Sequence, residues 1–154
     1  MPYGQCSYRD VPMVENGKHT CIENTYATDL FTDNALNFLE DQVNEEAPFC
    51  LNVSYTAPHK PWGREHHPEE LWDDYYNNCP FETTPGPEEP IASGFQRYSF
   101  LSPGDAEERN KIDSAELRRQ DLAGYFASIE AMDINIGRLL DWLERNKLRN
   151  NTLI

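Results

Sequence analysis

The chain has 154 residues, enough for one domain with its own hydrophobic core. Asp and Glu number 27 against 13 Lys and Arg, which gives a net charge of −14. Binding to nucleic acid or to an anionic membrane surface requires clustered basic residues, so the composition argues against both partners. No stretch approaches the roughly 18 consecutive apolar residues of a membrane span. The first residues also lack the basic region and apolar core of a signal peptide.

Residues 1–25 are predicted to contain a β-hairpin. Asn16-Gly17 is the preferred pair for a tight type I′ turn, because both positions need a positive φ. Cys6 and Cys21 flank this hairpin and are able to pair in an oxidising compartment. Cys50 and Cys79 add further pairings, and the sequence does not choose among them.

Residues 26–62 are predicted to form a helix, a strand and a loop. Apolar residues recur every three to four positions after Thr28, which indicates an amphipathic helix with Thr28 or Asp29 as its N-cap. Residues 49–55 are mostly apolar, and we expect a buried strand in which Cys50 is a small buried hydrophobe.

His59 is the main candidate for chemistry. It lies between Pro58 and Pro61, which restrict the backbone, at the carboxyl end of the expected strand. Ligands of α/β sheets bind at this end of the strands. An imidazole there can donate a hydrogen bond, carry charge or supply a proton. Taken alone, these residues also allow a surface turn with an incidental histidine.

The second half of the chain is predicted to be a loop and a long helix. Residues 63–112 are rich in Pro and Gly, so we expect an irregular loop on the substrate side, with a short helix after Pro68. Over residues 113–149 the apolar spacing indicates one helix, or two joined near Gly124. Gly124 and Gly137 disfavour a helix, so we expect both to mark close packing.

Taken in order, these segments resemble the sulfatase family of the alkaline-phosphatase-like fold. Residues 26–39 resemble the helix before the family's central strand, and residues 48–62 resemble that strand and its histidine loop. Residues 125–140 resemble the long helix that follows. Residues 150–154 hold Asn-Thr-Leu-Ile, which matches the start of the next strand.

The resemblance implies an α/β fold, namely a partial sheet-and-helix sandwich that is incomplete in this chain. Residues 1–154 would then be an internal fragment of a single catalytic domain. The family's reaction is hydrolysis of a sulfate ester. A formylglycine made from Cys or Ser attacks sulfur, while a divalent cation, usually Ca²⁺, and Lys and His side chains hold the sulfate oxygens.

His59 matches the family histidine that contacts the sulfate near the leaving oxygen. Lys60 and Trp62 are expected to bind substrate at the rim of the pocket. Pairing of Lys60 with a carboxylate and packing of Trp62 in the core are the alternatives. His66 and His67 have no assigned role, and contact with substrate at the rim is one option for them.

The formylglycine motif C/S-x-P-x-R is absent, since the segments at Cys6 and Cys79 lack its spacing. No metal ligands are expected within the chain either. The nucleophile and the Ca²⁺ ligands are therefore expected outside it, and this fragment alone is expected to be inactive.

Two other functions remain open. A hydrolase of phosphate monoesters, phosphate diesters or phosphonates has the same superfold, and a non-catalytic acidic interaction module fits the charge. For a sulfatase, the expected partner is a small-molecule or glycan sulfate ester. Many family members are exported, and the sequence leaves the localisation open.

Overall fold

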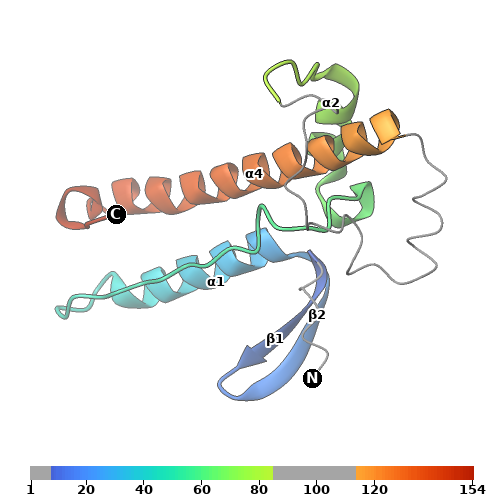
Figure 1. Cartoon of the computed structure of the whole chain (residues 1–154). Helices are drawn as coiled ribbons and strands as arrows, with labels where there is room; N and C mark the ends of the chain where they lie inside the picture. Colours follow the sequence, from blue (N-terminus) through green and yellow to red (C-terminus); the bar gives the residue numbers. More distant parts are fainter. Residues whose placement is uncertain (1–7, 85–113) are drawn as a thin grey trace, which may run out of the picture.

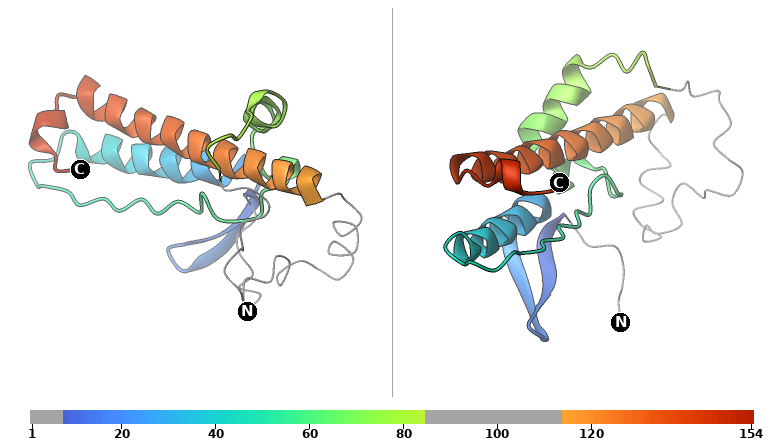
Figure 2. Two further views of the ribbon diagram at one scale, coloured as in Figure 1. Left: turned by 45° about the horizontal axis from the view of Figure 1, so that its top comes forward. Right: turned by 90° about the vertical axis from the view of Figure 1, so that its left-hand side faces the viewer.

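The computed structural model of the chain describes residues 8–84 and 114–154. Its elements are β1 (Arg9–Glu15), β2 (Lys18–Tyr26), α1 (Ala27–Gln42), η1 (Arg64–His66), α2 (Glu69–Asn78), α4 (Ser114–Arg145) and η2 (Arg149–Asn151). Helices α1 and α4 lie side by side, the short helix α2 packs on α4, and the hairpin projects from the start of α1 (Figure 1 and Figure 2). Most of the loop expected over residues 63–112 lies outside the described residues.

The predicted hairpin is confirmed. Strands β1 and β2 pair antiparallel, with Glu15 opposite Lys18. Asn16 and Gly17 form the turn with φ of 49° and 79°, as a type I′ turn requires. Cys21 is exposed, and Cys6, its partner in the expected pairing, lies outside the described residues.

The predicted helix after the hairpin is confirmed, but its expected N-cap is wrong. Helix α1 begins at Ala27, and the N-cap is Tyr26, which makes no side-chain capping bond. Because β2 runs directly into the helix, Thr28 and Asp29 fall inside the first turn. The backbone N–H of Ala27 donates instead to the carbonyl of Tyr8, the residue before β1, at 2.8 Å.

The expected strand over residues 49–55 is extended but is not a regular strand. A strand requires ladder hydrogen bonds to a neighbour, and within the described residues no strand lies beside this segment. Alternate residues are half-buried, and Phe49 packs edge-to-face on Phe38 of α1 with ring centroids 6.2 Å apart. Cys50 occupies the other face and is exposed, so the expectation of a buried thiol is wrong. The strand expected at residues 150–154 is likewise absent from the described part, where η2 and an extended tail occur.

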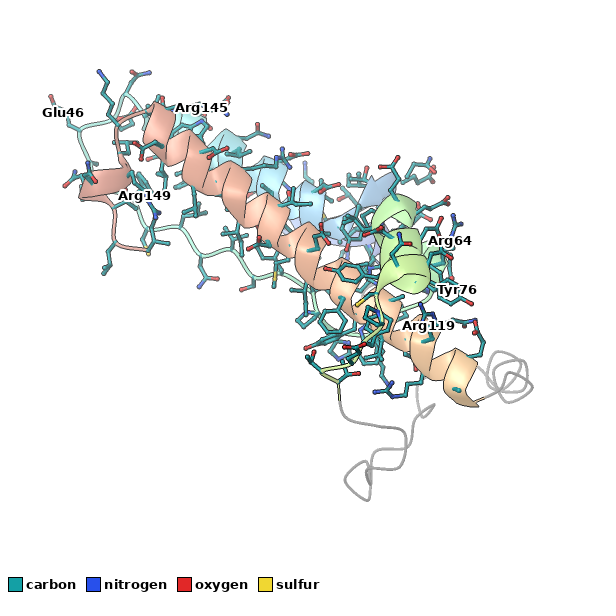
Figure 3. All side chains as sticks on the ribbon, turned by 90° about the horizontal axis from the view of Figure 1, so that it is seen from above. Glu46, Arg64, Tyr76, Arg119, Arg145 and Arg149 are labelled. Atoms are coloured by element: carbon teal, nitrogen blue, oxygen red, sulfur yellow. The ribbon has the colours of Figure 1, made fainter. Side chains whose placement is uncertain are left out.

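An apolar groove of about 850 Å³ runs between α1, the extended segment and the carboxyl-terminal half of α4. Its lining includes Leu39, Phe49, Leu51, Leu139, Leu140 and Leu143. Figure 3 places Glu46, Arg145 and Arg149 at this end of the molecule, and Arg64, Tyr76 and Arg119 at the other. The extended segment lines this groove as far as Tyr55, but the lining does not include His59.

Helix α4 is one continuous helix of 32 residues, and a row of small side chains follows one of its faces. Ala123, Ala127 and Ser128 have no exposed surface, and Ala131 is 4% exposed. Gly124 belongs to the same face, and an ideal Cβ there would lie 1.9 Å from the carbonyl oxygen of Trp62. The absence of a side chain at Gly124 thus allows the loop backbone to lie directly on the helix.

Close packing is confirmed at Gly124 but is wrong for Gly137. Among the described residues, no atom lies within 4 Å of a Cβ built at Gly137. Every helix within the described ranges is too short or too polar to cross a lipid bilayer.

A buried amide connects α1 to α4. Asn135 is 2% exposed, and its Nδ2 donates to Asp29 of α1 at 2.7 Å and to the carbonyl of Ala131 at 2.9 Å. Its oxygen accepts a bond from Arg138 at 2.8 Å, and Arg138 also pairs with Asp33 at 2.5 Å. Because its polar groups are satisfied, the buried amide fixes how the two helices align.

Candidate active site around His59

His59 lies in the loop of residues 57–62, between the extended segment and η1. The peptide bonds Ala57–Pro58 and Lys60–Pro61 are both cis. The backbone N–H of His59 donates to the carbonyl of Thr56 at 3.0 Å, which closes a turn. The side chain of His59 is exposed. The loop therefore holds the backbone of the histidine in place and presents its ring at the surface.

The contact of the His59 ring with its own loop indicates which ring nitrogen carries the hydrogen. Nδ1 lies 2.9 Å from the carbonyl oxygen of Lys60. A carbonyl oxygen only accepts, so Nδ1 carries the hydrogen in this bond. Nε2 is then an acceptor when the ring is neutral and a donor when the ring is protonated. Proton exchange with a ligand would take place at Nε2.

Two aromatic side chains bind carbonyls of the loop, and a third anchors its end. The hydroxyl of Tyr8, which is fully buried, donates to the carbonyl of His59 at 2.6 Å. The indole N–H of Trp62 donates to the carbonyl of Pro58 at 3.0 Å, and the indole N–H of Trp72 in α2 donates to the carbonyl of Trp62 at 3.1 Å. These bonds satisfy loop carbonyls that no secondary structure would satisfy.

His67 forms a further side-chain bond to this loop. It has no exposed surface, and its Nε2 lies 2.9 Å from the carbonyl of Pro61. Its Nδ1 lies 3.3 Å from the hydroxyl of Tyr26. Burial lowers the pKa of His67 to about 4, so the ring is neutral at physiological pH. The option of a rim contact with substrate is therefore wrong for His67, which is a buried structural group.

Lys60 and Trp62 belong to the same loop as His59, and their side chains contact each other. The ammonium of Lys60 is 5.0 Å from the centroid of the Trp62 ring, a cation–π contact. Trp62 also packs edge-to-face on Tyr125 of α4, with centroids 5.7 Å apart. These contacts favour packing as one use of Trp62. Substrate binding by Lys60 and Trp62 stays a prediction.

Polar contacts fix α2, which carries Trp72, against α4. Arg119 of α4 donates to the carbonyl of Tyr76 at 2.7 Å, and the hydroxyl of Tyr76 donates to Glu116 at 2.6 Å. The bond from Tyr76 holds the pKa of the Glu116 carboxyl below its usual range. Figure 3 shows Tyr76 and Arg119 together where the two helices meet. The anchor of the loop on Trp72 thus depends on the packing of α2.

The described residues do not form a metal site. Among them, no group of three or more His, Cys, Asp or Glu side chains is arranged to hold an ion. The adjacent carboxylates Asp73 and Asp74 lie in α2, and Asp73 is bound by Arg64 at 2.6 Å. The described residues therefore do not fit the Ca²⁺ ion that the resemblance implies. The sequence also contains no C/S-x-P-x-R segment for a nucleophile.

Sequence reasoning singled out His59 as a candidate from its flanking prolines, and this assignment stays a prediction. It did not identify the contacts of Tyr8, Tyr26 and His67 around the loop. The only local signal at His67 was its position before Pro68, which is the N-cap of α2. Nothing in the sequence spacing connects this histidine with Tyr8, just before β1, and Tyr26, the last residue of β2. The contact arises because the pairing of the two strands brings both tyrosines to the open end of the hairpin, where His67 lies.

Comparison with known proteins gives a consistent result. The family model described as Sulfatase matches residues 3–154. The N-acetylglucosamine-6-O-sulfatase of Bacteroides thetaiotaomicron is 30% identical over 97% of this chain, which covers 36% of that protein. The iduronate 2-sulfatase of Homo sapiens is 27% identical over 80% of this chain, which covers 23% of that protein.

One solved structure is similar as well. It is described as BT4656 in complex with its substrate D-glucosamine-2-N,6-O-disulfate, with a TM-score of 0.59 and 27% identity over 98% of this chain and 40% of that one. The chain thus spans well under half the length of these relatives. The family match extends over nearly every residue, including the helix, the histidine loop and the long helix on which the resemblance rests. The chain belongs to the sulfatase family.

Proposed function

We propose that the protein containing this chain hydrolyses sulfate esters, and that His59 contacts the sulfate group near the leaving oxygen. The observation that carries this proposal is the loop of residues 57–62. Its backbone is bound by the buried side chains of Tyr8 and Trp72, while the ring of His59 is exposed. This arrangement suits a group that must meet a ligand in a fixed position.

The tautomer of His59 supports a specific role. Cleavage of the sulfur–oxygen bond places negative charge on the leaving oxygen, and a donor at that oxygen stabilises it. With Nδ1 bound to the carbonyl of Lys60, the ring presents Nε2, which donates a hydrogen bond or a proton when the ring is an imidazolium. Protonated His59 thus serves as the donor to the leaving oxygen.

The proposed reaction also requires a nucleophile and a cation. The family resemblance implies formylglycine and a divalent cation, expected to be Ca²⁺, which would supply the attacking oxygen and neutralise sulfate charge. The described residues supply neither, so no step is assigned through them.

We further propose a sulfated sugar as the substrate. Two relatives are named for N-acetylglucosamine and iduronate sulfates, and the similar solved structure holds a glucosamine disulfate, whereas another relative is named a choline-sulfatase. Lys60 offers a cation and Trp62 an aromatic ring in the same loop as His59, which suits an anionic sugar ring. A phosphate ester hydrolase and a non-catalytic acidic module remain the competing functions.

The test uses the full-length protein. It is assayed with glucosamine 6-sulfate and an aryl sulfate, and in parallel with the corresponding phosphate esters. The expected result is turnover of the sulfate esters, which His59→Ala lowers by at least about tenfold. His19→Ala, at an exposed position of β2, is the matched control and should leave turnover unchanged.

Three outcomes would contradict the proposal. Preference for the phosphate esters would favour the phosphoryl hydrolase. Absence of turnover on any ester would favour the interaction module. An unchanged rate in His59→Ala would remove this histidine from the mechanism.

A further inference from the structure

We propose that His67 is a positioning residue for His59, and that it acts by binding the loop carbonyl of Pro61 from inside the protein. This inference rests on the proposed function of His59. His67 does not touch substrate in this proposal, because it has no exposed surface. Its effect on the reaction passes through the backbone of the loop.

The geometry shows that both halves of the loop are held by one cluster of side chains, which we call the Tyr8–Tyr26–His67 cluster. Tyr8 binds the carbonyl of His59 at 2.6 Å, and His67 binds the carbonyl of Pro61 at 2.9 Å. The rings of Tyr8 and His67 are 4.6 Å apart, and those of Tyr8 and Tyr26 are stacked at 5.7 Å. Movement of one member would therefore displace both tethers of the loop.

The hydrogen bonds of His67 define its tautomer. The carbonyl of Pro61 only accepts, so Nε2 carries the proton. In the neutral ring Nδ1 is then an acceptor, and the hydroxyl of Tyr26 donates to it. A protonated ring would have no acceptor for Tyr26 and would bury a charge. The cluster therefore requires a neutral His67.

The groups around His67 agree with a neutral ring. Arg9 of β1 donates to the carbonyl of His67 at 3.0 Å, which brings a positive charge close to the ring. Glu65 and His66 of η1 act on it with opposite signs, and burial has the largest effect on its pKa. Tyr8 and Tyr26 stay protonated, since burial raises the pKa of both hydroxyls.

The loop is also held from its other side, where the carbonyl of Trp62 rests on Gly124 of α4. The hairpin side and the helix side thus fix the loop between them. The His67 contact can be changed through a single side chain that lies outside the helices. Substitution of His67 therefore tests the positioning of the loop more directly than substitution of Gly124.

The experiment uses the full-length protein and a sulfate ester. His67→Phe removes both hydrogen bonds, and Tyr26→Phe removes one hydroxyl while keeping the ring. We expect His67→Phe to lower kcat by about tenfold with KM changed less than about twofold, and Tyr26→Phe to lower kcat by a smaller factor. His19→Phe, outside the cluster, should leave both constants unchanged.

A double-mutant cycle separates positioning from general damage. If His67 acts through His59, then His67→Phe should change kcat less than about twofold once His59 is already Ala. An equal loss in both backgrounds would overturn the proposal, because it would show that His67 affects the rate independently of His59. If His67→Phe fails to fold, the same cycle is run with Tyr26→Phe.

Two readouts do not depend on activity. Nitrogen-15 spectra at neutral pH should show His67 with its proton on Nε2, and a crystal structure of Tyr26→Phe or His67→Phe should show residues 57–62 displaced. A displaced loop in a protein that hydrolyses no sulfate ester would reject the proposed function and retain the positioning role. An Nδ1-protonated ring with an undisturbed loop would reject the positioning role, whatever the activity.

Discussion

The carbonyl oxygen of Trp62 rests on the backbone of α4 at Gly124, where a Cβ atom would lie 1.9 Å from it. Neither partner in this contact is the flexible end of a side chain, so neither can move aside cheaply. The relationship fixes the end of the histidine loop, and it makes Gly124 more sensitive to substitution than its place in a regular helix suggests.

Gly124→Ala is predicted to destabilise the protein by about 1–3 kcal/mol, because the added methyl group overlaps the loop backbone. Gly137→Ala is the matched control in the same helix. No described atom lies within 4 Å of that position, so the higher helix propensity of Ala should raise stability by up to about 1 kcal/mol. Urea unfolding of the full-length protein measures both effects. Equal stability changes in the two variants would contradict the packing at Gly124.

Acidification is predicted to destabilise the fold through His67. Its pKa is about 4 in the folded chain, below the ordinary value of about 6.5, so the unfolded chain binds the proton more readily. This contribution to stability is fully present above about pH 6.5 and is lost as the pH falls towards 4. Between pH 7.5 and 4.5 the loss should amount to about 2–3 kcal/mol.

The measurement compares the unfolding free energy of the natural protein with that of His67→Gln at both pH values. Carboxylates titrate in the same range, but they do so in both proteins and cancel in the comparison. The natural protein should lose more stability on acidification than the variant. Parallel pH dependences would show that His67 is not held neutral by its burial.

Lys60→Gln is predicted to raise KM for a sulfate ester by about threefold to tenfold while changing kcat less than about twofold. The reason is that a cation beside His59 contributes to binding of the sulfate in ground state and transition state alike. Lys18→Gln at the hairpin turn removes an exposed cation elsewhere and serves as the control. A fall in kcat with unchanged KM would instead assign Lys60 to the reaction step.

The regular elements could largely be predicted from the sequence because their signals are local. Asn16-Gly17 requires a tight turn, and the three-to-four spacing of apolar residues indicates α1 and α4. The segment of residues 49–55 could not be assigned correctly by the same reasoning. Its apolar composition suits a strand, but strand formation depends on a neighbour that the described part of the chain does not supply.

The candidate site was predictable only where chemistry and backbone restriction coincide in a short stretch. His59 meets this condition, since Pro58 and Pro61 flank it. His67 does not, because its role follows from contacts with Tyr8 and Tyr26, which are far away in sequence. Thr28 shows the same limit: a residue with good capping chemistry became buried in the helix because tertiary packing set the start of α1.

The row of small side chains on α4 has a mechanical consequence. At Gly124 the backbone of α4 meets the backbone of the loop, so no side-chain torsion lies between them, and a shift of the helix would move the end of the loop that carries the imidazole. The position of His59 would then depend on the shape of α4. Bending of this helix would displace the histidine even when every residue of the loop is unchanged.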